Sequence, residues 1–408
     1  MQNPCSTEID YKNLMDHIVK LPACTLITTG RTGTDFLQSL LDSHTEIMTF
    51  NGSLFFYAFW RDSYCAKVPN INLDDLLDEF IGKHIEKLKS HYDWLERKDR
   101  LGQNADESVS IDLLLFKKMA KALLSGRSIN SKNVLLAIYG AYSLCLGQEI
   151  ERKTLFFHHI HHAERLDNYL SDFPDSKIIC MTRDPRANFV SGVQHWKRYD
   201  QSKDNGSHLF YYINRILVDA YVLDKFNNDY MVMRIEDLGK KQVLEKLCDW
   251  LGISYEDQLA KSTWGGMIWR GDRVSSNESE VGGWSAKMLE NAWEEKLSLT
   301  DKYLLNFLMN SRLKFYGYQY QGINVLGYFT IPILILFPLS FELRYFSFSY
   351  LWAAFKNKDL RVVAVNCYSY LRRIVLFYKY YAKAIGCFKF SRKTSPRRPD
   401  VLKSIPYR

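Results

Sequence analysis

A glycine-containing loop with one arginine is the stretch of this sequence best suited to bind an anion. Residues 30–35 read Gly-Arg-Thr-Gly-Thr-Asp, between a short apolar run at residues 26–27 and apolar residues at helical spacing in 36–41. This order is typical of a buried strand, a tight turn and a helix. A loop that opens a helix directs backbone N–H groups at one point, where the helix dipole adds positive potential. Arg31 adds a full charge, so we expect a phosphate or a similar anion to bind here.

This loop differs from the usual nucleotide-binding loop. The usual form, G-x-x-x-x-G-K-[ST], uses its lysine and hydroxyl on a magnesium-bound triphosphate, whereas no lysine follows Gly33. Taken alone, the stretch is also compatible with an ordinary strand-to-helix turn that binds nothing. Asp35 is unfavourable beside a dianionic ligand unless it points away or is paired.

A second candidate anion site lies at Arg183 and Ser191. Arg183 follows an apolar run at residues 177–182, and Ser191 comes eight residues later on an expected helix. A bidentate arginine and a hydroxyl are suitable partners for a phosphate monoester. The alternative is that Arg183 pairs with a nearby acid and that Ser191 faces solvent.

Together these motifs resemble those of sulfotransferases that use 3′-phosphoadenosine 5′-phosphosulfate (PAPS). Residues 30–37 resemble the family's 5′-phosphosulfate loop, G-[RK]-[ST]-G-[ST]-[ST]-x-L, and residues 183–191 resemble its 3′-phosphate motif, R-[DN]-P-[RK]-x-x-x-x-S. Three weaker segments follow in the family's order: 233–238 (MRIEDL), 246–253 (KLCDWLGI) and 282–318, from a glycine–tryptophan turn (282–285) to Y-G-Y. The resemblance covers about residues 22–318.

The resemblance implies a P-loop-like, three-layer α/β domain with a central parallel sheet. It also implies transfer of a sulfuryl group from PAPS to an acceptor hydroxyl or amine, without a metal ion. Arg31 would stabilise charge on the leaving phosphate oxygen, and Arg183 and Ser191 would hold the 3′-phosphate. Arg270 and Gly271 distantly resemble an R-K-G element that contacts the same phosphate. The expected cofactor-binding residues are therefore Gly30, Arg31, Thr32, Gly33, Thr34, Asp35, Arg183, Ser191, Arg270 and Gly271.

A cluster of histidines offers a general base for the acceptor hydroxyl. His158, His159 and His161 end an apolar run that predicts a strand at residues 154–160. A histidine pKa of about 6.5 suits a general base, and in several sulfotransferases a histidine at the end of this strand has that role. His159 and His161 share one strand face and His158 the other. Because few of the histidines can converge, a zinc site is the weaker interpretation, and we expect no metal.

Alternating strand and helix patterns surround these motifs and favour a three-layer α/β domain. We predict further strands at residues 134–139, 177–182 and 230–234, and helices at 76–94, 111–124, 188–196 and 242–251. The expected organisation is a sulfotransferase domain over residues 1–320, including a helical acceptor-side insertion at 51–151, and a tail over 321–408. The aromatic cluster at residues 55–60 indicates core, or in a transferase an acceptor pocket.

Charge and cysteine content bear on partners and compartment. The chain of 408 residues has a net charge of +8, but residues 342–408 contain 15 Lys and Arg against three Asp and Glu. The basic character therefore belongs to the tail and does not indicate a nucleic-acid partner. Eight scattered cysteines without a C-x-x-C pair argue against a disulfide framework, and we find no signal peptide. We expect a cytoplasmic protein.

The tail has the composition of a membrane-associating segment. Residues 323–341 are strongly apolar and, at 19 residues, nearly long enough to span a bilayer. Pro332 and Pro338 suit a re-entrant or interfacial element, and a buried core helix is the alternative. Aromatic residues interleaved with Lys and Arg follow, as at membrane surfaces. One straight span would separate the basic tail from a cytoplasmic catalytic domain, so we expect peripheral or monotopic attachment to the inner face of the membrane.

The leading hypothesis is a PAPS-dependent sulfotransferase that acts on a hydroxyl of a glycan or glycolipid by in-line displacement. A P-loop nucleotide-dependent kinase is a second hypothesis, but it requires a lysine after Gly33 and an acid to hold magnesium. A non-catalytic membrane-associated relative is the third. Binding of the desulfated nucleotide, 3′-phosphoadenosine 5′-phosphate (PAP), distinguishes the first from the second, and turnover distinguishes the first from the third.

Overall fold

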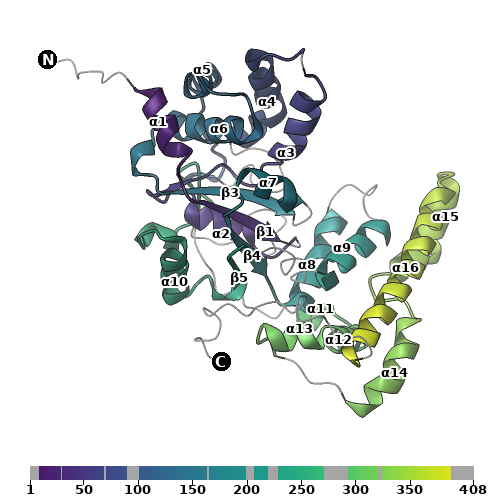
Figure 1. The fold of residues 1–408 in the computed structure, drawn as a ribbon. Coiled ribbons are helices and arrows are strands. Elements are labelled where there is room, and N and C mark those ends of the chain that lie inside the picture. Colours follow the sequence, from purple (N-terminus) through teal and green to yellow (C-terminus); the bar gives the residue numbers. More distant parts are fainter. Residues whose placement is uncertain are drawn as a thin grey trace. The chain divides into compact units, whose positions relative to one another are not determined.

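The computed structural model forms two compact units (Figure 1). It describes residues 9–28, 30–68, 70–89, 101–162, 165–198, 206–218, 228–270, 293–319 and 324–386. The first unit comprises Met1–Ile27, Thr34–Ile179 and Asp237–Met288, and the second unit comprises Thr28–Gly33, Cys180–Glu236 and Leu289–Arg408.

A central parallel sheet of five strands confirms the predicted fold class. The strand order is β2-β3-β1-β4-β5. The strands are β1 (Ala23–Thr28), β2 (Ile47–Met48), β3 (Leu155–His162), β4 (Lys177–Thr182) and β5 (Tyr230–Arg234). The predicted strands at 177–182 and 230–234 coincide with β4 and β5, and the one at 154–160 corresponds to β3. Because the strands of this sheet run parallel, β1 and β3 end at the same edge of the sheet.

The first unit contains eight of the described α-helices. They are α1 (Tyr11–Ile18), α2 (Thr34–Leu41), α3 (Phe56–Phe59), α4 (Leu73–Leu88), α5 (Leu113–Leu124), α6 (Ser131–Cys145), α7 (Leu166–Asp172) and α10 (Lys241–Leu251). A small antiparallel hairpin pairs β6 (Thr263–Trp264) with β7 (Met267–Ile268). Helices α5 and α6 pack together, and α1 packs on both. The short α2 begins at Thr34, so the last two residues of the predicted anion loop belong to the helix that the apolar spacing at 36–41 predicts.

The strand predicted at residues 134–139 is wrong, because this run belongs to helix α6. The Asn130 side chain caps the helix by accepting a hydrogen bond from the Asn133 N–H at 2.8 Å. Every residue from 134 to 143 is buried. A helix buried on all sides shows the same unbroken apolar run as a buried strand, so periodicity does not separate the two. Gly140 allows close packing, since a Cβ there would lie 2.8 Å from a methyl of Ile18 and would displace that methyl.

Helices of the second unit include the described part of the predicted tail. They are α8 (Pro185–Arg198), α9 (Gly206–Val218), α11 (Trp293–Lys296), α12 (Leu299–Leu308), α13 (Asn310–Phe315), α14 (Val325–Ile335), α15 (Phe348–Lys356) and α16 (Leu360–Ala384). Helix α16 packs on α9, α12, α14 and α15. The apolar segment 323–341 contains α14, which has 11 residues. Among the described residues, no helix is both long enough and apolar enough to cross a membrane.

Candidate functional site

The loop after β1 has an unusual backbone. Gly30, Arg31 and Gly33 adopt left-handed conformations, with φ of 95°, 55° and 83°. Glycine adopts this region freely, but Arg31 does so at a cost of roughly 1–2 kcal/mol. Such strain occurs where the surrounding structure holds a ligand-binding loop in shape. The backbone therefore has the tight turn that the two glycines predict.

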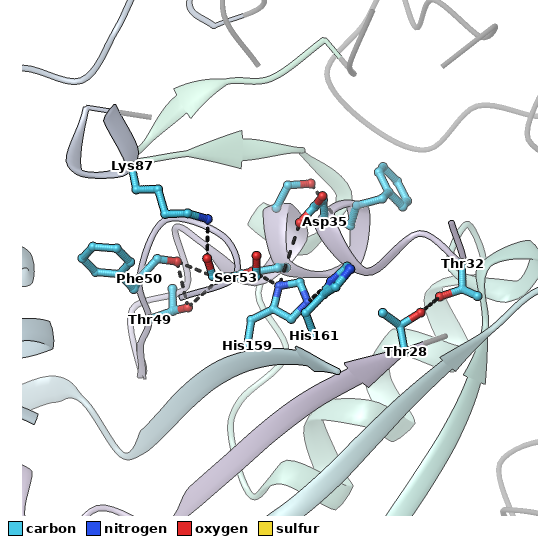
Figure 2. Close-up of polar contacts among 12 residues, drawn as sticks. Thr28, Thr32, Asp35, Thr49, Phe50, Ser53, Lys87, His159 and His161 are labelled. Carbon is cyan, nitrogen blue, oxygen red and sulfur yellow. Dashed lines mark hydrogen bonds and ion pairs between the residues drawn. The ribbon is translucent and has the colours of Figure 1, made fainter. Parts of the chain in front are cut away.

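Hydrogen bonds inside the loop hold this turn. The Thr28 hydroxyl oxygen accepts a hydrogen bond from the Gly30 N–H at 2.9 Å. The Thr28 and Thr32 hydroxyls are also hydrogen-bonded to each other (Figure 2). The Gly30 N–H is therefore directed toward Thr28 inside the loop, and the contribution of Gly30 is to the shape of the turn.

Gly33 is required by space as well as by conformation. A Cβ at this position would lie 2.3 Å from Cδ1 of Ile235, a buried side chain of the same unit. The loop backbone thus packs directly on the residue that follows β5. Any side chain at position 33 would displace Ile235 or the loop.

The two arginines of the Arg-Asp-Pro-Arg motif have different environments. Arg186 is buried and forms two hydrogen bonds with the Asp184 carboxylate, at 3.0 and 2.6 Å. Its third bond reaches Asn306 at 2.8 Å, and its guanidinium stacks 4.1 Å from the centre of the Trp293 ring. Arg183 is half-buried, and no described residue forms a hydrogen bond or ion pair with its guanidinium. Of this pair, Arg183 is the arginine available to a ligand, and it shares the second unit with loop residues Thr28–Gly33.

Glu236 positions the turn that carries Arg183. Its carboxylate accepts hydrogen bonds from the Asp184 N–H at 2.9 Å and from the Tyr318 hydroxyl at 3.2 Å. Burial raises the pKa of the Glu236 carboxyl, while the Asp184 N–H and the charge of Arg183 act in the opposite direction. Sequence reasoning identified the segment 233–238 only by resemblance and assigned Glu236 no role. The one available signal was a charged pair directly after a buried strand.

The closing Y-G-Y segment reaches the same place. Arg234, at the end of β5, donates a hydrogen bond to the Tyr316 carbonyl at 2.8 Å, and its guanidinium lies 5.6 Å from the centre of the Tyr318 ring. Three segments that are distant in sequence therefore support one another: the Arg183 turn, the end of β5 and residues 316–318.

The other predicted phosphate ligands are less closely defined. Ser191 is half-buried within α8. Arg270, in the first unit, donates a hydrogen bond to the Gln103 carbonyl at 3.3 Å. Gly271 and the glycine–tryptophan turn at 282–285 lie outside the described residues. Thr34 and Asp35 form the start of α2 in the first unit.

His158 is packed as a core residue. It is completely buried, with its ring stacked 5.4 Å from that of Tyr169 and its Nδ1 hydrogen-bonded to the Tyr139 hydroxyl at 2.7 Å. Burial lowers the pKa of this histidine to about 3. The ring therefore stays neutral, and its burial keeps it away from an acceptor. Of the three candidate bases, His158 is the one that this geometry disfavours.

His159 and His161 form a hydrogen-bonded chain whose direction is set by Gln38. The Gln38 amide nitrogen donates to the Phe50 carbonyl at 2.7 Å, so its amide oxygen faces His159 Nδ1 at 2.8 Å. His159 Nδ1 must then carry the proton, and its Nε2 accepts. The acceptor faces His161 Nδ1 at 3.1 Å, so that atom also carries a proton. In the neutral chain, the lone pair of His161 is therefore on Nε2.

The second histidine of this hydrogen-bonded pair is half-buried and has a strained backbone. His161 has a φ of 73°, which is rare for a residue with a side chain. Figure 2 shows its ring beside that of His159 at the end of β3. Asp35 lies on the other side of His159, 3.9 Å from its Nδ1. The Asp35 carboxylate therefore faces the histidine pair, but its Oδ1 accepts no hydrogen bond from the described residues.

Among the described residues, one group of side chains lies close enough together to hold a metal ion: His44, Glu46 and Glu256. Both ring nitrogens of His44 are already engaged. Nδ1 accepts a hydrogen bond from the Glu46 N–H at 3.1 Å, and Nε2 lies 2.9 Å from the Ser254 carbonyl, to which it donates. This pattern joins the segment after α2 to the segment after α10 and leaves no histidine lone pair for a metal ion.

Comparisons with known proteins agree with the motifs. A family model described as the sulfotransferase family matches residues 24–257, more than half of the chain. No curated protein matches. A solved sulfotransferase domain from the olefin synthase of Synechococcus PCC 7002 aligns with 15% identity and a TM-score of 0.33, covering 67% of this chain and 88% of that one. The sulfotransferase domain from the curacin biosynthetic pathway aligns with 17% identity and a TM-score of 0.32, covering 59% and 77%. Sulfotransferase STF9 from Mycobacterium avium aligns with 14% identity and a TM-score of 0.29, covering 60% and 67%.

Proposed function

Because the chain belongs to the sulfotransferase family, we propose that it transfers the sulfuryl group of PAPS to an acceptor hydroxyl. The acceptor oxygen forms a bond to sulfur while the bond from sulfur to the 5′-phosphate oxygen breaks. The acceptor proton passes to a general base, and PAP leaves with the electron pair of the broken bond. Such a displacement depends on positioning and on stabilisation of charge rather than on a metal ion.

The availability of Arg183 carries this proposal. Its partner in the motif, Arg186, is saturated by Asp184 and Asn306, whereas Glu236 fixes the turn of Arg183 from the backbone side. A planar guanidinium held in this way is suited to bind a phosphate in two places. The strained loop at Gly30–Gly33 is the second anion site of this proposal, in which Arg31 stabilises the leaving 5′-phosphate oxygen.

His161 is the general base in this proposal. A proton taken at Nε2 leaves the Nδ1–H donating to His159, and the charge-assisted bond stabilises the imidazolium. Gln38 holds His159 in the tautomer that accepts this bond, and the Asp35 carboxylate adds negative potential. Gln38 is a positioning residue, because it acts through His159.

The acceptor proposed is a hydroxyl of a glycan or glycolipid at the cytoplasmic face of a membrane. Two observations support this choice. Aromatic side chains gather after β2, where the half-buried Trp60 and Tyr64 rings stack with their centres 4.1 Å apart, and aromatic faces pack well on sugars. The described cysteines form no disulfide, as in reducing compartments. No nucleic-acid partner is proposed.

Calorimetric titration of PAP tests the donor assignment. We expect Arg183→Ala to weaken PAP binding by about 30- to 150-fold, the effect of removing a charged hydrogen-bond partner. The matched control is Arg152→Ala, which removes an exposed arginine from the first unit and should bind PAP like the wild type. A folded wild type that binds ATP and not PAP would instead favour the kinase.

The base assignment needs a readout of its own. His161→Asn should lower kcat by 10²- to 10⁴-fold and leave the affinity for PAP unchanged. Gln38→Glu should change the pH dependence of kcat, because a carboxylate at this position stabilises a charged His159, whereas Gln38→Ala should lower kcat without that change in profile. An unchanged kcat in His161→Asn would transfer the role to another residue. PAP binding without any turnover across acceptor classes would favour the non-catalytic relative.

A further inference from the structure

Helix α14 is apolar on every side, yet only one side is covered. Gly327, Ile331 and Ile335 are buried, where α14 packs on α12 and α16. The opposite side presents Phe329 and Ile333, which are 71% and 58% exposed. A helix that is apolar all round belongs in a core or in lipid, so its open side lacks the surroundings that its composition requires.

Helix α16 buries several polar residues and exposes several apolar ones. Its buried stripe holds Asn366, Ser369 and Arg373 beside Phe377 and Tyr380. Its exposed surface holds Tyr368, Leu371 and Val375, which are 61%, 59% and 70% exposed, together with the basic residues Arg361, Arg372 and Lys379. Helices at the surface of water-soluble proteins bury apolar residues and expose polar ones. Polar residues that face the protein interior are instead the pattern found in lipid.

Side chains of α16 satisfy the backbone where α14 is broken. Pro332 has no N–H, so the Tyr328 carbonyl loses its partner within the helix. The Tyr381 hydroxyl donates to that carbonyl at 2.7 Å, and the Tyr378 hydroxyl donates to the Pro332 carbonyl at 2.8 Å.

Side chains of α16 also donate hydrogen bonds to backbone carbonyls beyond the end of α14. Arg373 donates to the carbonyls of Ile335 and Phe337 at 2.7 and 2.9 Å, and the Tyr370 hydroxyl donates to the Leu336 carbonyl. The charge of Arg373 is balanced by Glu342 at 3.0 Å. In water, a turn of this kind needs no such partners. In hydrocarbon, every backbone group must be satisfied by the protein itself.

Helix α15 adds an aromatic and basic border. Phe348, Trp352 and Phe355 lie on one side of it at helical spacing and are 81%, 57% and 62% exposed. Exposed basic residues follow at Lys356, Lys358 and Arg361. Aromatic rings at the headgroup level and cations near anionic lipid are characteristic of interfacial attachment.

We propose that these helices dock into one leaflet of an anionic bilayer, without crossing it. The apolar face that enters the lipid consists of Val325, Leu326, Phe329, Ile333, Leu336, Phe337, Phe348, Trp352, Phe355, Leu371 and Val375. A second copy of the chain is the less suitable occupant, because residues 342–408 carry a surplus of 12 positive charges and self-association would bring like charges together. The inference does not depend on sulfuryl transfer.

Vesicle flotation with the full chain tests this docking. Wild type should float with vesicles of phosphatidylglycerol in phosphatidylcholine, and less so with phosphatidylcholine alone or at high salt. Replacing Phe329 and Phe348 together by Asp should lower the partition coefficient at least about 100-fold, since each burial of a phenylalanine is worth about tenfold or more.

The matched control replaces two exposed apolar residues of the first unit, Leu114 and Val68, by Asp. These are 83% and 51% exposed, so two exposed apolar residues are again replaced by two negative charges, and flotation should not change. Circular dichroism establishes that each variant folds. Equal flotation of both double variants would overturn the proposal. So would a wild type that ignores vesicles and forms a dimer broken by the Phe329 and Phe348 substitutions, since a second copy would then cover the face.

Discussion

Helices α10 and α16 are both amphipathic, but they bury different kinds of residue. In α10 the buried residues are apolar: Val243, Leu244, Leu247, Cys248 and Leu251. Charged residues such as Lys241 face outward. In α16 the buried residues include Arg373 and Asn366, while Leu371 and Val375 are exposed. Amphipathicity therefore identifies two faces of a helix, but it does not say which face points inward.

The difference follows from the medium that each helix faces. Water rewards burial of apolar area at roughly 25 cal/mol per Å², which directs Leu247 inward in α10. Against hydrocarbon that reward is absent, and the dominant requirement is to satisfy polar groups. Arg373 meets that requirement with two carbonyls and a carboxylate. The kinds of residue that α10 and α16 bury therefore indicate that α10 faces water and that α16 faces lipid.

The largest effect is expected at Arg373. Its replacement by Met should lower the free energy of unfolding by about 3–5 kcal/mol, because Glu342 is left buried without its partner. Denaturant unfolding of the full chain measures this change. In the double variant with Glu342→Leu, the loss should be smaller than the sum of the two single losses. Strict additivity would show that the pair is not coupled and would weaken the contrast with α10.

The corresponding substitution in α10 is Leu247→Ala. It deletes a fully buried side chain and should cost about 2–4 kcal/mol through lost burial and the cavity left behind. The control is Lys241→Ala on the outer side of the same helix, whose side chain is 63% exposed and whose loss should stay within about 0.5 kcal/mol. Thermal and denaturant unfolding check both. A large loss at Lys241 would contradict the assignment of faces.

His158 is a buried polar residue that, unlike Arg373, carries no charge in the folded protein. Its pKa is lowered to about 3, so below about pH 6.5 the unfolded chain binds a proton that the folded chain does not bind. Stability should therefore fall as the pH falls, by about 2 kcal/mol at pH 5. His158→Asn retains an acceptor for the Tyr139 hydroxyl and should remove that part of the pH dependence. Unfolding curves at pH 7 and pH 5 give the difference, and identical slopes in both proteins would contradict it.

The smallest effect is expected at Leu371, which is 59% exposed. In solution, Leu371→Ser should change the free energy of unfolding by no more than about 0.5 kcal/mol, unlike the buried Leu247. With anionic vesicles present, wild type should gain stability through binding, and the variant should gain less. Thermal unfolding with and without vesicles measures both quantities. A loss of stability without vesicles would place Leu371 in a protein core.

Local signals predicted most of the elements near the site. Residues 177–182 and 230–234 read as buried strands because turn residues bound them, and they are β4 and β5. Gly30 and Gly33 predicted the turn after β1, because glycine adopts left-handed backbone conformations such as theirs most easily. The strand predicted at residues 134–139 was wrong, because an apolar run inside a large core has no periodicity that distinguishes a helix from a strand.

Roles within the site required the tertiary structure. Arg183 and Arg186 are chemically identical in sequence, and only the contacts of Arg186 with Asp184 and Trp293 show which of them is occupied. Among the histidines, the direction of the proton chain depends on a Gln38 amide that Phe50 orients. Such hydrogen bonds join residues far apart along the chain, so no local pattern reports them.

The sequence alone therefore determined the family, the strand–loop–helix element and the apolar, basic character of the carboxyl-terminal region. These properties are local: they depend on residue type and short spacing. Only the tertiary structure decided that His158 lies in a core, that His161 is hydrogen-bonded to His159, and that α16 buries Arg373 while exposing Leu371. The physical reason is that side chains are buried and hydrogen-bonded by other segments of the chain. The free energy that directs one face of a helix inward therefore depends on the groups packed against that face.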